Sequence, residues 1–313
     1  MNLRPFGNTG MNVSEVGLGA WQLANPDWGI DDKNEALEIV QKSLEAGCNF
    51  FDTAPGYGGG RSEELLGQGL KSVRQDVILC TKFSHYSEDS GRDFDPKNVR
   101  PVLEGSFRRL QTDYMDILLL HNPPRELMDG KVSADLYAEL ENLKSEGRIR
   151  EYGVSLDWRV ELENVLDTTK SKAAEVFFNA LYQEMLPAFP KAQEQGMGLI
   201  VKVPLDSGWL SGRYRNGHRF EDVRSRWSPE VLARRSDLVE KFAALVPDGI
   251  SLAHAALQFV LAQPEVSTVI PGAKTVEQAL ANFAAADKQL SPNVVQSMRD
   301  LWTSEIESDP LPW

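Results

Sequence analysis

The segment FFDTAPGYGGGRSEELLG, residues 50–67, contains one complete strand, loop and helix unit. An apolar run ends at Asp52, a glycine-rich loop follows, and SEELLG begins with a serine and two acids, as helices often do. Because the apolar run is short and continuous, it predicts a strand of a parallel sheet that is buried on both faces. The loop places Tyr57 between glycines, directly after this strand. Asp52 and Tyr57 therefore need a joint explanation.

The same unit recurs along the whole chain. Short apolar runs predict strands, and helical patterns lie between almost all of them. The predicted strands cover residues 14–19, 49–52, 77–82, 115–121, 150–155, 175–180, 198–203 and 266–272. The predicted helices cover residues 31–47, 62–71, 96–110, 133–147, 185–196, 228–245, 251–262 and 275–286. Eight strands in 313 residues predict a closed (β/α)8 TIM barrel, as a single domain over residues 1–313.

Three further features refine this prediction. An open dinucleotide-binding sheet is a weaker interpretation, because the G-x-G at Gly17 and Gly19 lacks a third glycine and opens no helix. Residues 3–13, LRPFGNTGMNV, hold an Asn-Thr-Gly turn between extended segments and predict an N-terminal β-hairpin. The connection 205–250, after the seventh strand, exceeds an ordinary loop, so we expect it to cover a binding site or to be partly mobile.

The composition is that of a soluble globular chain with an acidic surface. The chain has 33 Lys and Arg against 46 Asp and Glu, a formal net charge of -13. Because this charge repels phosphate backbones and anionic lipid, we expect neither nucleic acid nor a membrane as a partner. The sequence shows no secretory leader and no apolar run of about 18 residues. With Cys48 and Cys80 both in apolar stretches, a cytoplasmic protein with core cysteines is expected.

Ionisable residues end three consecutive predicted strands: Asp52, Lys82 and His121. Each alone has an ordinary explanation, such as a cap, a snorkelling lysine or a core histidine. Together with Tyr57 they form a coherent proton-transfer unit at the carboxyl ends of barrel strands, where active sites lie. A tyrosine is a weak acid, and a nearby Lys82 ammonium would lower its pKa. Asp52 would balance Lys82, and His121 would orient a substrate oxygen.

These motifs resemble those of the aldo-keto reductase family, and the resemblance extends over essentially the whole chain. FDTAPGYGGGRSEELLG resembles the segment with the catalytic aspartate and tyrosine, TKF that with the lysine, and LLLHNP that with the histidine. The resemblance implies NAD(P)H-dependent interconversion of a carbonyl (aldehyde, ketone or sugar) and an alcohol by direct hydride transfer. Tyr57 would be the general acid/base, tuned by Lys82, with Asp52 and His121 in support.

The resemblance also implies a set of cofactor-binding positions: Trp21, Ser155, Asn179, Lys202, Leu205, Gly208, Leu210, Arg213, Gly272, Lys274, Gln278 and Asn282. Ser155 and Asn179 would hold the nicotinamide carboxamide, although Leu156 stands where the family usually has an asparagine. Lys202 stands where the family commonly has an aromatic. Three roles of Lys202 are open. Its stem would pack on the nicotinamide ring, its ammonium would contact a phosphate, or the residue would only end a strand and point to solvent.

Two segments concern the phosphates of the cofactor. VPLDSGWLSGRY, residues 203–214, resembles the family loop that folds across the pyrophosphate. Lys274 lies between a predicted strand and a predicted helix, where backbone amides favour an anion, and it suits a 2′-phosphate. We therefore expect NADPH, with NADH possible. Gln278 and Asn282 would reach the adenine, and only Arg213 of the arginine-rich stretch 213–226 is expected to bind phosphate.

The residues leave other functions open. A regulatory barrel that keeps the cofactor as a ligand, as in the potassium-channel beta subunits that resemble this family, is favoured by Leu156, Asn179 and Lys202 but opposed by Tyr57 and Lys82. A metal-dependent hydrolase is disfavoured, because the four histidines contain no H-x-H pair, and no metal site is expected. An aromatic substrate wall is expected from Trp21, Trp28, Tyr86 and Trp209. The physiological substrate and the oligomeric state do not follow from the sequence.

Overall fold

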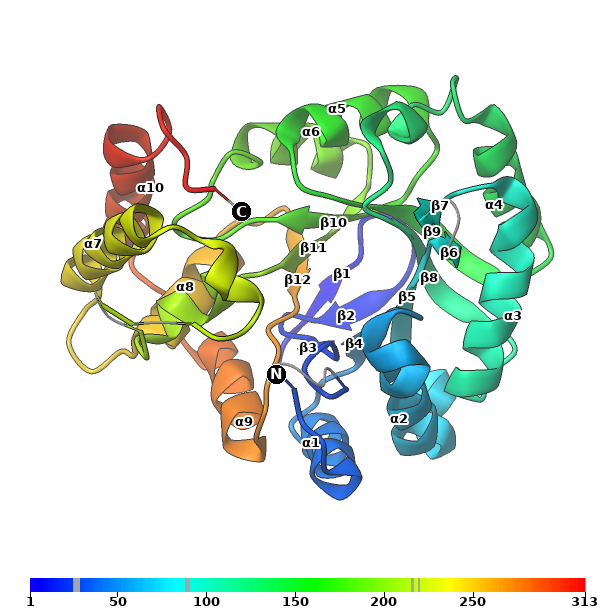
Figure 1. Ribbon diagram of the computed structural model, residues 1–313, viewed down its shortest axis with the longest axis horizontal. Coiled ribbons are helices and arrows are strands. Elements are labelled where there is room, and N and C mark those ends of the chain that lie inside the picture. The colour runs from blue at the N-terminus through cyan, green and yellow to red at the C-terminus, as the bar shows by residue number, and fades with distance from the viewer. Residues whose placement is uncertain (25–28, 88–90, 215–216, 219, 313) are drawn as a thin grey trace.

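A computed structural model describes residues 1–24, 29–87, 91–214, 217–218 and 220–312. Within them, eight parallel strands form one curled sheet inside a ring of helices (Figure 1). Each strand lies where the sequence predicts one, so the predicted (β/α)8 fold is confirmed. In spatial order the strands are β3 (Leu18–Gly19), β4 (Phe50–Asp52), β5 (Ile78–Phe83), β8 (Met115–His121), β9 (Ile149–Leu156), β10 (Ala173–Phe177), β11 (Gly198–Lys202) and β12 (Val266–Val269).

The first and last strands meet and close the sheet into a barrel. The Gly17 amide donates to the Val269 carbonyl at 2.8 Å, and the Val269 amide donates to the Glu15 carbonyl at 3.0 Å. A further parallel bridge joins Gly19 to Gly272. A Cβ at Gly19 would lie 2.7 Å from the Ile270 carbonyl oxygen, so the seam requires glycine here.

The helices cover the outside of the barrel and follow the predicted alternation. Asp32 accepts hydrogen bonds from the amides of Asn34 and Glu35 and so begins the first helix. Serine or threonine side chains cap α7 to α10 in the same way. The helices are α1 (Lys33–Glu45), α2 (Arg61–Leu70), α3 (Val99–Leu110), α4 (Ala134–Ser145), α5 (Arg159–Thr168), α6 (Phe189–Glu194), α7 (Pro229–Leu245), α8 (Leu252–Leu261), α9 (Val276–Ala284) and α10 (Pro292–Glu305). Of these, α5 and α10 are additional to the helices expected from the sequence. No helix in the described part of the chain could cross a membrane.

The inside of the barrel changes from apolar to polar toward the carboxyl ends of the strands. Apolar side chains fill its lower part: Phe50, Ile78, Cys80, Ile117, Leu119, Ala173, Ile200 and Ile270. Since side chains alternate along a strand, the residue two positions further on faces inward as well. On β4, β5 and β8 these positions are Asp52, Lys82 and His121. The barrel therefore brings inward-facing polar residues from neighbouring strands to one end.

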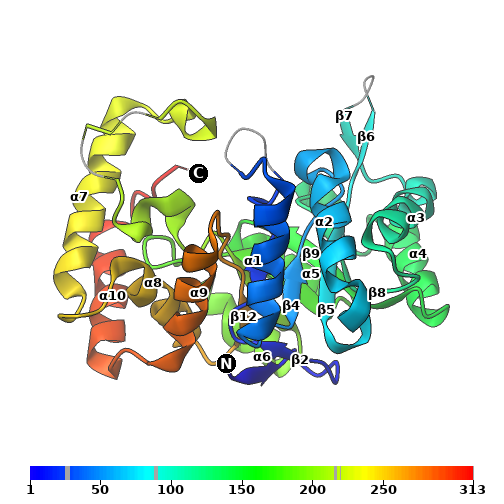
Figure 2. The ribbon, with the colours of Figure 1, turned by 90° about the horizontal axis from the view of Figure 1, so that it is seen from below.

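A hairpin closes the opposite end of the barrel, as the sequence predicts. Strands β1 (Leu3–Pro5) and β2 (Asn12–Ser14) pair antiparallel, and Phe6 and Met11 join the apolar interior. Phe6 is fully buried and stacks on Phe50 with ring centroids 6.3 Å apart. Figure 2 shows the hairpin at one end of the molecule and β6 (His85–Ser87) with β7 (Gly91–Asp93) at the other.

The long connection after β11 has its own structure in its described part. It contains short 3-10 turns at Asp206–Ser211 and Val223–Arg226 before α7 begins. Asp206 and Arg235 form a buried ion pair that ties the first turn to α7. Arg235 also donates to the carbonyl of Pro312 at 2.9 Å. Arg235 on α7 thus connects the Asp206–Ser211 turn to Pro312 near the C-terminus.

Replacing Phe6 with alanine should destabilise the barrel, because it removes the ring that closes the apolar interior. The expected loss of unfolding free energy is about 3–5 kcal/mol, measured by urea denaturation. Leu3→Ala on the same hairpin is the control, since Leu3 is 56 % exposed, and it should change stability little. Equal losses for the two variants would contradict a role of the hairpin as part of the core.

Candidate active site

Asp52 and Lys82 meet inside the barrel mouth, as expected from the sequence. The Lys82 ammonium lies 2.6 Å from Oδ1 and 2.7 Å from Oδ2 of Asp52, and it donates to the Thr53 carbonyl at 3.1 Å. Both side chains are almost fully buried. Burial acts to lower the pKa of Lys82, but the charges of Asp52 and then Glu175 outweigh it and hold the pKa well above its usual value. Lys82 is therefore a charged ammonium near neutral pH.

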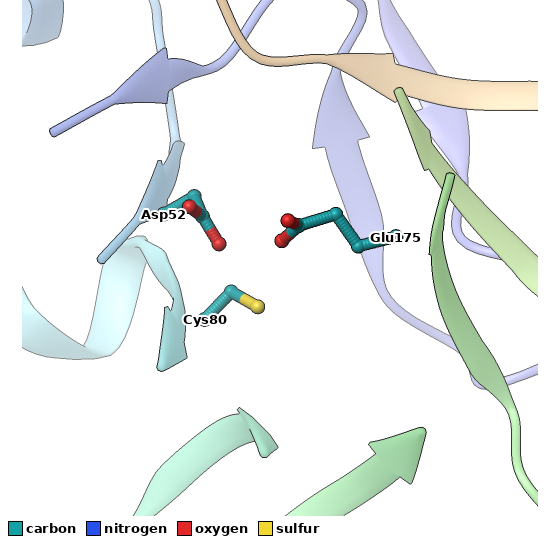
Figure 3. Close-up of side chains that lie close together, drawn as sticks. All are labelled: Asp52, Cys80 and Glu175. Carbon is teal, nitrogen blue, oxygen red and sulfur yellow. The ribbon is translucent and has the colours of Figure 1, made fainter. Parts of the chain in front are cut away.

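Glu175 on β10 is a second carboxylate on the same ammonium, and it was not expected from the sequence. Its Oε2 lies 3.0 Å from the Lys82 Nζ. Figure 3 shows the Asp52 and Glu175 side chains pointing toward each other across the barrel interior. The signal in the sequence is an acid inside the otherwise apolar strand AAEVF. An acid in a buried strand needs a partner, which a search restricted to strand ends does not reveal.

Asp52, Cys80 and Glu175 also have the composition of a small metal site (Figure 3), with their ligand atoms within 4.8 Å of one another. The Lys82 ammonium, however, already supplies a cation within 3.0 Å of both carboxylates. Burial, then the charge of Asp52, raises the pKa of the Cys80 thiol well above its usual value. A protonated thiol is a poor metal ligand. The cluster is best described as a lysine held by two acids.

Tyr57 stands over this cluster at the start of a glycine turn. Its ring centroid lies 5.3 Å from the Lys82 Nζ and 5.8 Å from the His121 ring, which it meets edge-on. The next residues, Gly58, Gly59 and Gly60, have φ angles of 58°, 64° and 98°. A Cβ on Gly58 would lie 2.2 Å from the Ala24 carbonyl oxygen. The glycines thus allow the left-handed turn that places the phenol beside the lysine before α2 begins.

The pKa of Tyr57 differs from the expectation. Burial raises it above the usual value, the Lys82 charge lowers it, and Asp52 and Glu175 raise it again. Lys82 thus lowers the pKa of Tyr57 as expected, but burial, the largest effect, outweighs it, and the two carboxylates add to the rise. Tyr57 is consequently a neutral phenol near neutral pH, which is the form that donates a proton.

His121 faces Tyr57 as a neutral imidazole. Burial, followed by the charges of Lys82, Arg92 and Lys202, holds its pKa well below its usual value. The Arg92 Nη2 on β7 lies 3.4 Å from the His121 Nδ1. Because a guanidinium only donates, Nδ1 is the acceptor and the hydrogen of the neutral ring is on Nε2. His121 can therefore donate a hydrogen bond from Nε2 to a substrate oxygen.

Lys202 belongs to the same inward-facing group and does not point to solvent. Its Nζ lies 2.8 Å from the Asp157 Oδ1, 2.9 Å from the Ser155 Oγ and 3.1 Å from the Asn122 Oδ1. The Ser155 hydroxyl lies 3.0 Å from the Glu175 Oε1. A continuous polar network therefore runs from Lys202 through Ser155 and Glu175 to Lys82.

Two of the expected cofactor residues use their side chains within the fold. Asn179 is fully buried; its Nδ2 donates to the Val203 carbonyl at 3.1 Å, and its Oδ1 accepts from the Leu181 amide at 2.9 Å. Leu210 is also fully buried in the apolar core. The Asn179 amide is thus engaged with backbone groups, and the expected contacts of Asn179 and Leu210 with the cofactor stay predictions.

The loop after β11 has the backbone conformation expected near a ligand. Val203, Asp206 and Ser207 have φ angles of 54°, 47° and 53°, in a region that such residues rarely adopt. Gly208 follows with a φ of 91°, and Leu205 remains half-buried beside it. Strained backbone of this kind concentrates at ligand sites. The loop therefore has the geometry to bring backbone amides close to a ligand.

Cations gather at the start of α9, where the sequence predicts a phosphate site. Burial, then the charge of Arg224, lowers the pKa of Lys274, and Arg213 acts in the same direction. Arg224 is almost fully buried, with its guanidinium 4.2 Å from the centroid of the Phe220 ring. Most of the stretch 213–226 was expected to be a solvated face, and Arg224 is an exception. The cations and the first turn of α9 fit a phosphorylated cofactor.

Gln278 and Asn282 shape the loop before α9. The Gln278 Oε1 accepts from the Lys274 amide at 3.0 Å, and the Asn282 Nδ2 donates to the Gly272 carbonyl at 3.2 Å. Their side-chain amides thus hold the Gly272 to Lys274 backbone in place. The expected contact of both residues with an adenine stays a prediction.

The expected aromatic wall is only partly present in the described residues. Trp21 is half-buried, whereas Trp209 is 1 % exposed and packs against Tyr214 and Phe220. Trp209 is therefore a core residue of the loop and not part of a substrate wall. Trp28 and the side chain of Tyr86 lie outside the described part of the structure.

Known proteins are similar to this chain in sequence and in fold. A model of the Aldo/keto reductase family matches residues 15–303. The chain is 34 % identical to an L-galactose dehydrogenase from Arabidopsis thaliana over 98 % of its length and 94 % of the relative. It is 28 % identical to an NADH-specific methylglyoxal reductase from Escherichia coli (strain K12), covering 95 % and 97 % of the two chains. The holo form of an aldo-keto reductase from Bacillus halodurans superposes with a TM-score of 0.82 at 30 % identity, covering 96 % of each chain.

The family match spans most of the chain, including every element that forms the barrel mouth. The sequence relatives and the structural neighbour extend over nearly all of it. The chain belongs to the aldo/keto reductase family and is an NAD(P)H-dependent oxidoreductase.

Proposed function

We propose that this protein interconverts a carbonyl compound and an alcohol with NADP(H), using Tyr57 as the general acid/base. The observation that carries the proposal is the arrangement of Tyr57 between the Lys82 ammonium, 5.3 Å from its ring, and the neutral His121 ring at 5.8 Å. A proton donor and a hydrogen-bond donor thus face the same space at the carboxyl ends of the strands. That is the geometry needed to polarise and protonate a carbonyl oxygen.

The residues divide the work of reduction among them. The bound nicotinamide supplies the hydride to the carbonyl carbon. The His121 Nε2–H orients and polarises the carbonyl oxygen, and the Tyr57 hydroxyl transfers its proton to that oxygen as negative charge develops. The Lys82 ammonium stabilises the charge that remains on the Tyr57 oxygen, and Asp52 keeps the ammonium in place. In the alcohol-oxidising direction each transfer runs backwards.

NADPH is the proposed cofactor. The support is the group of cations at the start of α9, where the charges of Arg224 and Arg213 lower the pKa of Lys274 and that of Asp222 raises it. A 2′-phosphate adds negative charge at the position such a group would stabilise. The relative from Escherichia coli is named as NADH-specific, so family membership alone does not select the cofactor. Ser155, Lys202 and the loop around Leu205 and Gly208 are proposed to lie against the nicotinamide and pyrophosphate.

The substrate is proposed to be an aldehyde, ketone or sugar. The relatives include an L-galactose dehydrogenase and a methylglyoxal reductase, which are named for a sugar and a small carbonyl compound. A regulatory barrel is the second candidate, since the chain is also 29 % identical to a probable voltage-gated potassium channel subunit beta from Oryza sativa subsp. japonica. The buried amide of Asn179 favours this candidate, because it leaves the carboxamide site one side chain short.

One experiment separates the two candidates. Purified protein is titrated with NADPH and with NADH, and a panel of aldehydes, ketones and sugars is then added while the absorbance of the reduced cofactor is followed. Binding followed by oxidation of NADPH supports the reductase and begins to identify the substrate. Binding without turnover of any carbonyl compound contradicts it and supports the regulatory barrel.

Tyr57→Phe should reduce kcat by about 10²–10⁴-fold and leave cofactor affinity nearly unchanged, because it removes a proton donor that acts only in the transition state. Steady-state kinetics and a cofactor binding titration measure the two effects. Tyr152→Phe is the control, since it removes another buried hydroxyl, bound to Glu141 at 2.6 Å, outside the site. Wild-type turnover in Tyr57→Phe would contradict the assigned role.

Lys274→Ala should weaken the binding of NADPH more than that of NADH, because it removes a charge expected to contact the 2′-phosphate. The expected change in the ratio of the two dissociation constants is about tenfold or more, measured by fluorescence titration. Lys288→Ala removes an exposed lysine beyond α9 and serves as the charge control. Equal weakening of both cofactors by Lys274→Ala would exclude a 2′-phosphate contact.

A further inference from the structure

A fourth oxygen lies near the Lys82 ammonium besides the three that accept its hydrogens. The ammonium carries three N–H hydrogens, and four oxygens lie near its Nζ. These are the Asp52 Oδ1 at 2.6 Å and Oδ2 at 2.7 Å, the Glu175 Oε2 at 3.0 Å and the Thr53 carbonyl at 3.1 Å. The Glu175 Oε2 accepts no hydrogen bond from the ammonium and contributes only its charge. The second carboxylate, Glu175, therefore needs an explanation beyond hydrogen bonding.

Glu175 is held firmly in this position. The Ser155 hydroxyl lies 3.0 Å from the Glu175 Oε1, and the Lys202 ammonium lies 2.9 Å from that hydroxyl. The single hydroxyl hydrogen of Ser155 has two acceptors within reach, the Asn122 Oδ1 at 2.9 Å and the Glu175 Oε1 at 3.0 Å. Because Lys202 also donates to the Asn122 Oδ1 at 3.1 Å, that oxygen keeps a donor when the hydroxyl turns to Glu175. Burial acts to raise the pKa of Glu175, but the charges of Lys82 and Lys202 outweigh it and hold the pKa below its usual value. Glu175 is thus a fixed negative charge.

We propose that Glu175 is a positioning residue of the reaction that acts through Lys82: its negative charge, 3.0 Å from the ammonium, offsets part of the ammonium charge and so keeps Tyr57 in its proton-donating form. The inference rests on the proposed role of Tyr57 as general acid. It assigns a function to a buried side chain that touches neither the phenol nor, in the mechanism above, the substrate. The two carboxylates thereby limit how strongly the ammonium stabilises the phenolate form of Tyr57.

The groups around Tyr57 agree with this role. The titratable and charged groups around the mouth come from each element packed there: Asp52 on β4, Lys82 and Cys80 on β5, Arg92 on β7, His121 on β8, Glu175 on β10 and Lys202 on β11. Burial is the main cause of the raised pKa of Tyr57, and among the charges Lys82 lowers it while Asp52 and Glu175 raise it. Reduction uses the phenol, which is present below this pKa and is lost above it. Glu175 therefore extends the active range toward higher pH.

The test compares Glu175→Gln with the wild type in two measurements. The first is the ionisation of Tyr57 in the cofactor-free protein, followed by tyrosinate absorbance as the difference from a matched Tyr57→Phe protein, and it needs no turnover. The second is the alkaline limb of the pH profile of kcat/KM for carbonyl reduction. We expect both midpoints to fall by about one pH unit or more, because one negative charge near the ammonium is removed. Glu175→Asp, which keeps the charge, should restore most of the wild-type midpoint.

Glu63→Gln is the matched control. Glu63 is also a fully buried carboxylate, bound by Thr81 at 2.7 Å and Arg109 at 2.6 Å, but it lies on α2 outside the barrel. It should lower stability without moving either midpoint. If Glu175→Gln does not fold, Glu175→Met removes the same charge with an unbranched side chain and should give the same shift.

Two results would overturn the inference: unchanged midpoints in Glu175→Gln, or the same shift in Glu63→Gln. Failure of the proposed function looks different. In that case the wild type reduces no carbonyl compound, while the tyrosinate titration still shows whether Glu175 controls the ionisation of Tyr57. A lower kcat in Glu175→Gln with unmoved midpoints would indicate only a structural role and would also contradict the inference.

Discussion

A buried ammonium is the constraint on which the site depends. Removing a lysine charge from water costs several kcal/mol unless carboxylates compensate, and Lys82 is 1 % exposed. Asp52 and Glu175 supply that compensation from opposite sides of the barrel, at 2.6 Å and 3.0 Å. The barrel must therefore hold β4, β5 and β10 so that Asp52, Lys82 and Glu175 lie at the same level along the barrel axis. Tyr57 and His121 acquire their protonation states from the same cluster, since Lys82 contributes to the pKa of each.

Strand alternation explains how much of this site could be predicted. Asp52, Lys82 and His121 end apolar strands, so their convergence follows from the sequence pattern and from the closure of the barrel. Glu175 lies within a strand, and its distance to Lys82 depends on the stagger of strands that are far apart in sequence. The net pKa of Tyr57 depends on both carboxylates and on burial together. These quantities require the three-dimensional arrangement.

The cofactor region shows a second reason why sequence motifs do not predict side-chain contacts. Asn179 and Leu210 occupy positions that match a family pattern, yet hydrogen bonds to backbone and burial in the core already engage their side chains. Lys202 could be read in several ways from the sequence, and its contacts with Asp157 and Ser155 exclude a solvent-facing side chain. The eight strands and the hairpin were predictable because each depends on local pattern, whereas side-chain partners across the mouth depend on loops.

Transfer of deuterium from the cofactor tests the central claim most directly. NADPH deuterated at C4 of the nicotinamide is incubated with the protein and with a carbonyl compound that it reduces, and the alcohol product is examined by mass spectrometry. The account predicts one deuterium on the carbinol carbon in the wild type and almost no product with Tyr57→Phe. A product formed without deuterium, or equally fast by Tyr57→Phe, would contradict direct hydride transfer assisted by Tyr57.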